Sequence, residues 1–185
     1  MLGPGDVAID CGANVGLVTE VLANRGAEVH AFEPNPDAFE LLRERCGKLS
    51  RVHLYPQAVL DAPGTLKLHL HLNYDCNRER FSKGSSLIAE KGNVSETRAV
   101  EVEVIDLADF IARLGKPIKI LKMDIEGAEY KVLHRLIESG VIDSIEQVFV
   151  ETHAHSIRSL REPDKAIRAL IEARDLGHKI DLNWV

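Results

Sequence analysis

The sequence has no excess of positive charge. Its 23 lysines and arginines are outnumbered by 29 aspartates and glutamates, which gives a formal net charge of −6. Proteins that bind nucleic acids usually present a basic face to the phosphate backbone. We therefore expect no nucleic-acid partner and favour a small or uncharged ligand.

Cysteines and long apolar runs are also scarce. The three cysteines, Cys11, Cys46 and Cys76, form no C-x-x-C pair and are odd in number, which argues against a disulfide framework and a cysteine zinc site. No apolar run approaches the roughly 18 residues of a membrane span, and the chain starts with MLGPGD instead of a basic and hydrophobic leader. We expect a cytoplasmic protein without a membrane anchor. The sequence does not indicate its oligomeric state.

The sequence does contain an alternation of strand and helix patterns. Apolar runs that read as strands are followed by apolar residues at helical spacing. The expected strands are 7–11, 28–33, 51–56, 118–123, 145–151 and a last one near 178–185, and the expected helices are 17–22, 35–46, 107–114, 129–139 and 163–174. Such alternation predicts parallel pairing through right-handed crossovers. We therefore predict an α/β fold with a doubly wound, mostly parallel, Rossmann-like sheet, in one domain over residues 1–185.

Residues 64–105 interrupt this pattern. Leucines at 66, 68, 70 and 72 and valines at 100, 102 and 104 alternate with polar residues, which predicts two antiparallel strands with one wet face each. His69 and His71 lie on that wet face, where solvation explains them better than a metal site. Between the strands, residues 73–97 form a long polar segment that we interpret as a functional loop.

The first expected strand leads directly into a glycine-rich turn. Asp10, Gly12 and Gly16 form a D-x-G-x-x-x-G motif before a helix, and glycines there let a ligand approach bare backbone. A dinucleotide-binding loop would have glycine in place of Asn14, so binding of NAD is disfavoured. Glu33 ends the second strand, where a carboxylate can accept hydrogen bonds from both ribose hydroxyls of a nucleoside. The turn and Glu33 together suit an adenosine-containing cofactor.

Four segments, VAIDCGANVG, FEPNP, KMDIEGAE and VETH, resemble in order and spacing the signature of FkbM-type methyltransferases. The resemblance implies a class I methyltransferase dependent on S-adenosylmethionine, with a seven-stranded sheet whose last strand is antiparallel. It also implies methylation of a hydroxyl group on a small molecule, sugar or glycan. The expected N-terminal extension is lacking, which leaves the substrate lid unassigned. The expected cofactor-binding residues are Asp10, Gly12, Asn14, Gly16, Glu33, Asn35 and Asp124, together with Gln57 and Ala58, for which the resemblance implies contact with adenine.

Three carboxylates follow the expected strand 118–123. Asp124 lies at its carboxyl end, the edge where such folds bind ligands, and we expect it to hold the methionine end of the cofactor or a metal beside it. Glu129 is explained by the favourable placement of a negative charge in the first turn of a helix. For Glu126 the sequence leaves two interpretations open, a helix cap or a side chain in the cleft.

The next strand carries the candidates for proton transfer. Glu151 and His153 are two residues apart at its carboxyl end and so lie on one side of an extended chain. Attack by a hydroxyl on a methyl group needs a positioned base or a metal. We expect His153 or Glu151 to be the base, with Asp124 and Glu126 beside them, and His155 is a weaker candidate. A Mg²⁺ or Mn²⁺ site formed by these carboxylates and His153 is the less favoured interpretation.

Two other functions remain open. A chain that keeps the cofactor fold but has no lid could be a non-catalytic module that binds S-adenosylmethionine. A nucleotide-dependent oxidoreductase is disfavoured by the spacing of the glycine loop. The sequence does not indicate which acceptor is methylated.

Overall fold

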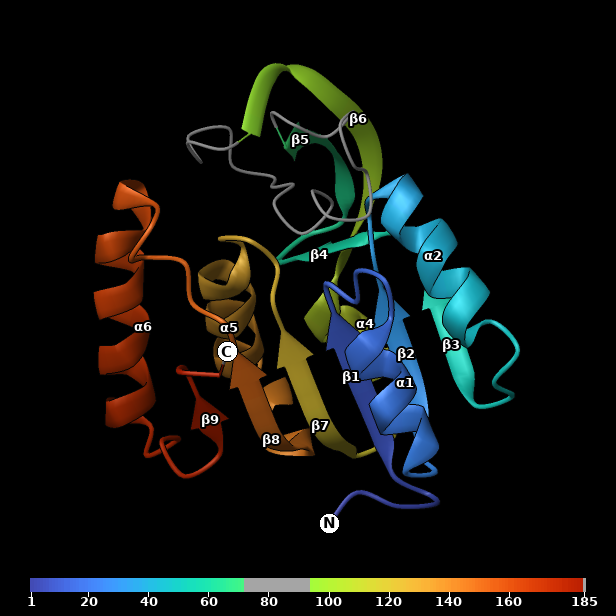
Figure 1. Cartoon of the computed structure of the whole chain (residues 1–185). Coiled ribbons are helices and arrows are strands. Elements are labelled where there is room, and N and C mark those ends of the chain that lie inside the picture. The colour runs from blue at the N-terminus through green and yellow to red at the C-terminus, as the bar shows by residue number, and fades with distance from the viewer. Residues whose placement is uncertain (72–93, 185) are drawn as a thin grey trace.

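The computed structural model describes residues 1–71 and 94–184 (Figure 1). Its elements, in chain order, are β1 (Val7–Cys11), α1 (Leu17–Asn24), β2 (Glu28–Phe32), α2 (Pro36–Cys46), β3 (Val52–Tyr55), β4 (Ala58–Leu60), β5 (Gly64–His71), β6 (Val94–Asp106), α4 (Leu107–Leu114), β7 (Ile118–Met123), α5 (Glu129–Glu138), η3 (Val141–Ser144), β8 (Ile145–Val150), η4 (Arg158–Leu160), α6 (Arg161–Ala173) and β9 (Ile180–Asp181). Within the described residues, a six-stranded sheet has the order β3-β2-β1-β7-β8-β9, and a three-stranded sheet has the order β4-β6-β5.

All neighbouring strands of the six-stranded sheet are parallel, which confirms the doubly wound fold. β7 pairs with β1, so the strand order reverses between these two strands. The expectation of seven strands with an antiparallel last strand was wrong for the described residues, because the sheet has six strands and β9 is parallel to β8. α6 connects β8 to β9, and a strand that returns after a crossover helix enters the same sheet in parallel.

The core lies on both faces of the six-stranded sheet. Val7, Ile9 and Cys11 of β1 belong to one buried cluster with residues of α4, α5 and α6, whereas Ala8 packs with Leu22 of α1. This alternation follows from the period of two in a strand, which sends successive side chains to opposite faces. Figure 1 accordingly shows α1 in front of the strands and α4 and α5 behind them.

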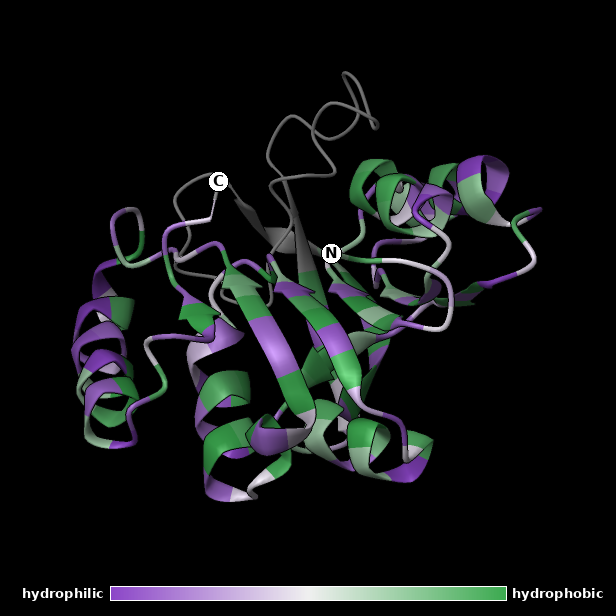
Figure 2. Cartoon of the chain, turned by 90° about the horizontal axis from the view of Figure 1, so that it is seen from below, coloured by the Kyte–Doolittle hydropathy of each residue, from purple (hydrophilic) through white to green (hydrophobic). Residues whose placement is uncertain are grey.

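α2, α4 and α5 begin and end within one residue of the predicted bounds, whereas α1 extends to Asn24 and α6 begins two residues early, at Arg161. The side chain of Asn35 accepts hydrogen bonds from the amides of Asp37 and Ala38 at the start of α2, and Asp106 caps α4 in the same way. Figure 2 shows that the helices carry both hydrophobic and hydrophilic residues, as expected for helices with one face on a sheet. No helix in the described ranges has the length and apolarity needed to cross a membrane.

The three-stranded sheet lies beyond the carboxyl ends of the larger sheet (Figure 1). β5 and β6 pair antiparallel, as their alternating patterns predict, but β4 also pairs with β6, in parallel. β4 was not predicted, because three residues are too few to show a period. β6 begins at Val94, so residues 94–97 of the expected loop are part of a strand. The loop's other residues, 73–93, and the side chains of His69 and His71 lie outside the described part.

Candidate functional site

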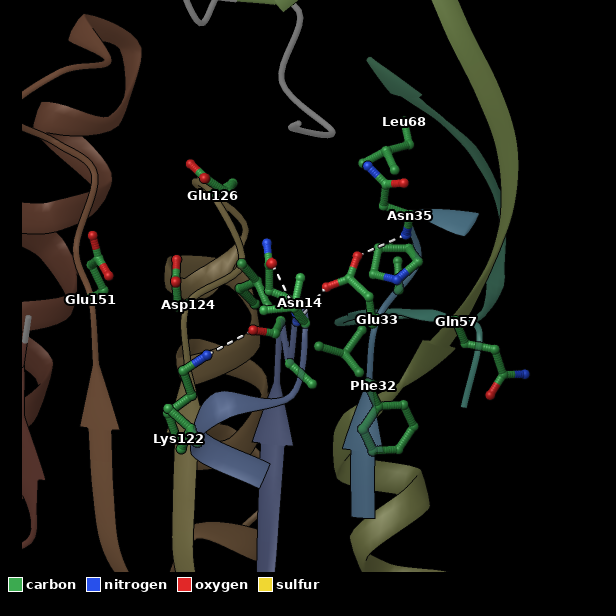
Figure 3. Close-up of a pocket in the computed structure, with 18 of the residues that line it drawn as sticks. Asn14, Phe32, Glu33, Asn35, Gln57, Leu68, Lys122, Asp124, Glu126 and Glu151 are labelled. Carbon is green, nitrogen blue, oxygen red and sulfur yellow. Dashed lines mark hydrogen bonds between the residues drawn. The ribbon is translucent and has the colours of Figure 1, made fainter. Parts of the chain in front are cut away.

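A cavity of about 330 Å³ lies at the carboxyl ends of β1, β2 and β7 (Figure 3). Doubly wound folds bind ligands at this edge, beside the point where the strand order reverses. Most of the predicted site residues line this one cavity: Gly12, Asn14, Glu33, Asn35, Gln57, Ala58, Asp124, Glu126 and Glu151. Asp10, Gly16 and His153 are not among the lining residues. The cavity therefore brings together residues from five segments of the sequence.

The turn after β1 needs glycine for two different steric reasons. Gly12 has a φ of 75°, and a Cβ atom there would lie 1.8 Å from the carbonyl oxygen of Asp124. Gly16 has a φ of 85°, and its Cβ would lie 2.8 Å from Cδ1 of Leu42 on α2. Gly12 therefore lets the turn touch the end of β7, and Gly16 lets it pack against α2. Asn14 also has a positive φ, 49°, which asparagine tolerates better than most residues.

Glu33 is held in the wall of the cavity by backbone amides. Its two carboxylate oxygens accept hydrogen bonds from the amides of Asn14 and Asn35, each at 2.8 Å. Burial raises the pKa of Glu33 to about 7, even though these two hydrogen bonds favour the charged form. Figure 3 shows the carboxylate between the turn after β1 and the start of α2. Its orientation is thus fixed before any ligand binds.

Lys122 is a site residue that the sequence analysis missed. Its ammonium group donates a hydrogen bond of 2.7 Å to the carbonyl oxygen of Gly12 and forms a buried ion pair of 3.2 Å with Asp10. Asp10 also accepts a hydrogen bond of 2.7 Å from the hydroxyl of Thr19. Lys122 lines the cavity and lies 5.6 Å from the ring centroid of Trp184. Asp10 thus fixes the lysine and α1, while the lysine fixes the glycine turn. The signal available for it was a second lysine, besides Lys119, in the apolar strand 118–123.

Apolar side chains form the other part of the wall. Phe32 at the end of β2, Val59 on β4 and Leu68 on β5 line the cavity near Gln57 and Ala58. Two of these three come from the smaller sheet, which therefore forms part of the cavity wall. The sequence analysis identified Leu68 only as part of an alternating strand, because nothing in a single strand shows what its apolar face covers.

Carboxylates gather on the side of the cavity formed by β7 and β8 (Figure 3). Asp124, Glu126 and Glu151 all line it. Burial, with added repulsion from Glu151 and Glu126, raises the pKa of Asp124 to about 6, although Lys122 opposes this shift. This side of the cavity therefore carries concentrated negative charge, which suits a cationic ligand group.

His153 lies beside these carboxylates, and each of its ring nitrogens contacts a glutamate. Its Nδ1 is 3.0 Å from Oε1 of Glu129, and its Nε2 is 3.2 Å from Oε2 of Glu126 and 3.8 Å from Oδ1 of Asp124. Burial alone would lower the pKa of His153, but the hydrogen bonds to Glu126 and Glu129 outweigh it and raise the pKa to about 10. His153 is therefore a cation at neutral pH. His155 is exposed and does not line the cavity.

Glu129 does more than begin α5. Its carboxylate is fully buried and accepts hydrogen bonds from the amides of Gly127, at 2.7 Å, and His153, at 3.1 Å, besides the contact with the imidazole. Glu126 is not the cap of α5, because Ala128 occupies that position. Glu126 instead adopts a φ of 57° and lines the cavity. The sequence could not show the Glu129–His153 contact, since 24 residues separate the two.

A divalent cation is one conceivable occupant of this acidic side. Single ligand atoms of Asp124, Glu126 and His153 lie within 4.8 Å of one another. However, both ring nitrogens of His153 already contact carboxylates, so a metal would have to displace Glu126 from Nε2. The protonated imidazole already places one positive charge beside these carboxylates.

Comparison with known proteins supplies a family. The model described as the methyltransferase FkbM domain matches residues 10–180. The chain is 32% identical to the 31-O-demethyl-FK506 methyltransferase FkbM of Streptomyces tacrolimicus, covering 82% of this chain and 67% of that protein. It is 28% identical to the 2-O-methyltransferase NoeI of Sinorhizobium fredii, over 91% of this chain and 71% of that protein. It is 31% identical to the hexuronic acid methyltransferase AglP of Haloferax volcanii, over 80% of this chain and 56% of that protein.

Proposed function

The chain belongs to the methyltransferase FkbM domain family, and we propose that it transfers a methyl group from S-adenosylmethionine to a hydroxyl oxygen of a sugar, glycan or natural-product small molecule. The observation that carries the proposal is the buried carboxylate of Glu33, held by two backbone amides in the wall of a cavity beside the glycine turn. The names of two relatives specify methylation at oxygen, and a third relative acts on a hexuronic acid.

The cavity fits the cofactor in volume and in chemistry. Its volume of about 330 Å³ lies within the roughly 300–1,000 Å³ of small-molecule sites. The oxygens of Glu33 would accept hydrogen bonds from the ribose hydroxyls, and Phe32, Val59 and Leu68 would contact the adenine ring. Asp124 would face the positively charged methionine end. When bound, S-adenosylmethionine supplies a methyl group on a positively charged sulfur.

The acidic side of the cavity would receive the acceptor hydroxyl. His153 does not suit the role of base, because it is already protonated and both nitrogens contact glutamates. Glu151 lines the cavity, and among the described residues no hydrogen bond or ion pair engages its carboxylate. Glu151 therefore takes the hydroxyl proton, and His153 holds Glu126 in place beside it. A positioned base typically contributes about 10²–10⁴-fold to the rate.

The cofactor site is tested by calorimetry with S-adenosylhomocysteine. The purified protein is expected to bind this product, and Glu33→Ala is expected to weaken binding at least about tenfold, since hydrogen bonds to a charged group contribute about 1.5–3 kcal/mol. Glu146→Ala, which removes an exposed carboxylate at the opposite end of β8, is the matched control. A folded protein that fails to bind S-adenosylhomocysteine would overturn the proposal. Competition by NAD would point instead to an oxidoreductase.

Catalysis is tested separately, with a labelled methyl donor and a panel of sugar and natural-product alcohols. Once an acceptor is found, Glu151→Gln is expected to lower kcat by about 10²–10⁴-fold while leaving binding of S-adenosylhomocysteine unchanged. An equal loss in both measurements would assign Glu151 to binding. If the protein binds S-adenosylhomocysteine but methylates no member of the panel, the non-catalytic alternative gains support.

A further inference from the structure

A second cluster of histidine and carboxylate side chains lies at the amino ends of β2 and β3, away from the cavity. Glu28 and His30 are two residues apart on β2, and His53 is the neighbour of His30 in the parallel pairing with β3. Their side chains therefore share one face of the sheet. Nε2 of His30 and Nε2 of His53 lie 3.3 Å and 3.5 Å from the same oxygen, Oε1 of Glu28.

His30 carries an unsatisfied nitrogen toward this cluster. Its side chain is 5% exposed, and its Nδ1 lies 2.9 Å from the hydroxyl of Tyr55. Nε2 is buried and has no hydrogen-bond partner among the described residues, although Oε1 of Glu28 is close. A buried nitrogen without a hydrogen bond is costly, because it has lost its contact with water. With Nδ1–H donated to Tyr55, Nε2 presents a lone pair beside a carboxylate oxygen, and a cation between the two would satisfy both.

We propose that Glu28, His30 and His53 bind a zinc ion. Zinc takes histidine nitrogens and carboxylate oxygens at about 2.0–2.2 Å in tetrahedral geometry, so neighbouring ligand atoms lie roughly 3.3–3.6 Å apart. The distances of 3.3 Å and 3.5 Å match this separation, and one ligand atom from each of the three residues lies within 4.8 Å of the others. Three protein ligands leave one position open, toward a hollow lined also by Ser50 and Arg51.

Tyr55 is placed as an outer hydrogen-bond partner of the proposed zinc ligand His30. A histidine that binds a metal usually donates its other ring N–H to an oxygen, which fixes the tautomer and the orientation of the ring. The hydroxyl of Tyr55 is placed for this role on the Nδ1 side of His30. The rings of His30 and His53 are stacked with centroids 4.8 Å apart, and both Nε2 atoms approach the same oxygen of Glu28.

Lys116 is the present partner of the carboxylate but does not block the site. Its ammonium group lies 2.7 Å from Oε2 of Glu28, the oxygen that faces away from the histidine contacts. Zinc would bind Oε1 alone, and Lys116, which is 47% exposed, can keep Oε2 or move into solvent. Its charge lowers the affinity but leaves the three ligand atoms in place.

The site would join β3 to β2 at the edge of the sheet. It is independent of the methyl-transfer proposal, because none of its ligands lines the cofactor cavity. The test uses the full chain, freed of metal with a chelator and titrated with Zn²⁺ by calorimetry. Co²⁺ is titrated in parallel, because its visible spectrum reports tetrahedral nitrogen and oxygen ligands.

We expect one Zn²⁺ per chain, with binding lost in Glu28→Gln and in His53→Ala. His53 is 47% exposed, so its loss leaves the fold intact. Tyr55→Phe is expected to weaken binding by about 10–100-fold, as is typical for an outer hydrogen-bond partner. His134→Ala, which removes an exposed histidine on α5, is the control and should bind like the parent.

Two results would overturn the proposal. One is the absence of stoichiometric binding to the folded, metal-free chain. The other is binding that survives His53→Ala but is lost in Glu126→Gln, which would place the metal in the cavity instead. Binding of S-adenosylhomocysteine by the His53→Ala variant should equal that of the parent, so a failure of one proposal does not imply a failure of the other.

Discussion

Among the described residues, two buried histidines have carboxylates beside them, and their protonation states differ. His153 at the end of β8 contacts Glu126 through one ring nitrogen and Glu129 through the other. His30 on β2 contacts the hydroxyl of Tyr55 through one nitrogen and has no hydrogen bond on the other. Burial disfavours the charged ring in both, but it prevails only at His30, where His53 adds repulsion and the pKa is lowered. In these two histidines, the charge of the ring depends more on its hydrogen-bond partners than on the extent of its burial.

The comparison also separates two uses of the same residue types. In the His153 cluster, the imidazolium contacts Glu126 and Glu129 and can hold both carboxylates in place beside a ligand cavity. In the His30 cluster, Nε2 of His30 and Nε2 of His53 approach the same oxygen of Glu28, and Nε2 of His30 has no hydrogen bond among the described residues. The first arrangement suits positioning, and the second suits coordination of a cation.

The largest effect is expected from breaking the His153 cluster at Glu129. Glu129→Ala removes a fully buried carboxylate and leaves the imidazolium and two backbone amides without their partner. Losing one member of a buried ion pair typically costs about 3–5 kcal/mol in the free energy of unfolding. Urea unfolding measures this loss. Glu138→Ala, at an exposed position on the same helix, should change stability by no more than about 0.5 kcal/mol. Equal losses of unfolding free energy in the two variants would show that the buried carboxylate of Glu129 does not stabilise the fold in this way.

A second effect is a pH dependence that comes from His153. Its folded-state pKa of about 10 lies above the ordinary value of 6.5, so its stabilising contribution is complete below pH 6.5 and is lost as the pH rises through 10. The free energy of unfolding should therefore fall between pH 6.5 and 10. His153→Gln should show a flatter dependence over this range. Parallel curves for the two proteins would contradict the prediction.

Glu126→Gln should make the environment of His153 more like that of His30. The substitution keeps the shape of the side chain but removes one charged partner, so the pKa of His153 should fall below about 10 by a unit or more. One unit corresponds to about 1.4 kcal/mol. NMR titration of the imidazole carbon-bound protons, with His153→Gln used for assignment, measures the shift. An unchanged midpoint would assign the raised pKa to Glu129 alone.

The smallest effect is expected at His53. In the presence of a chelator, His53→Ala should change the free energy of unfolding by no more than about 0.5 kcal/mol, because the side chain is half exposed and its contact with Glu28 is at the surface. Thermal and urea unfolding measure this change. A loss of several kcal/mol without metal would mean that the His30 cluster is, like the His153 cluster, a structural ion pair.

The order of the strands and helices could be predicted from the sequence because each element carries a local signal. Asn35 and Asp106 are helix caps with the expected side-chain hydrogen bonds, and the apolar runs mark β1, β2, β7 and β8. β4 has three residues and no period, and the direction of β9 depends on the crossover through α6. The existence of β4 and the direction of β9 were missed because each depends on pairing with strands that are distant in the sequence.

The candidate site could be predicted where a residue follows a strand and a turn. Asp124, Glu33 and Gly12 are of this kind, and all three line the cavity. What such reasoning missed depends on contacts between distant segments. Lys122 reaches the turn after β1 from a different strand, and Glu129 reaches His153 across 24 residues. The state of His153 therefore could not be predicted from the strand on which it lies.

The close approach of Gly12 to Asp124 has a mechanical consequence. No Cβ atom fits between them, so the glycine turn and the acidic side of the cavity are in direct backbone contact. Lys122 reinforces this contact by donating a hydrogen bond to the carbonyl oxygen of Gly12. A ligand that displaces the glycine turn must therefore displace the backbone of Asp124 with it. Occupation of one half of the cavity would be transmitted to the other half as strain, without any moving domain.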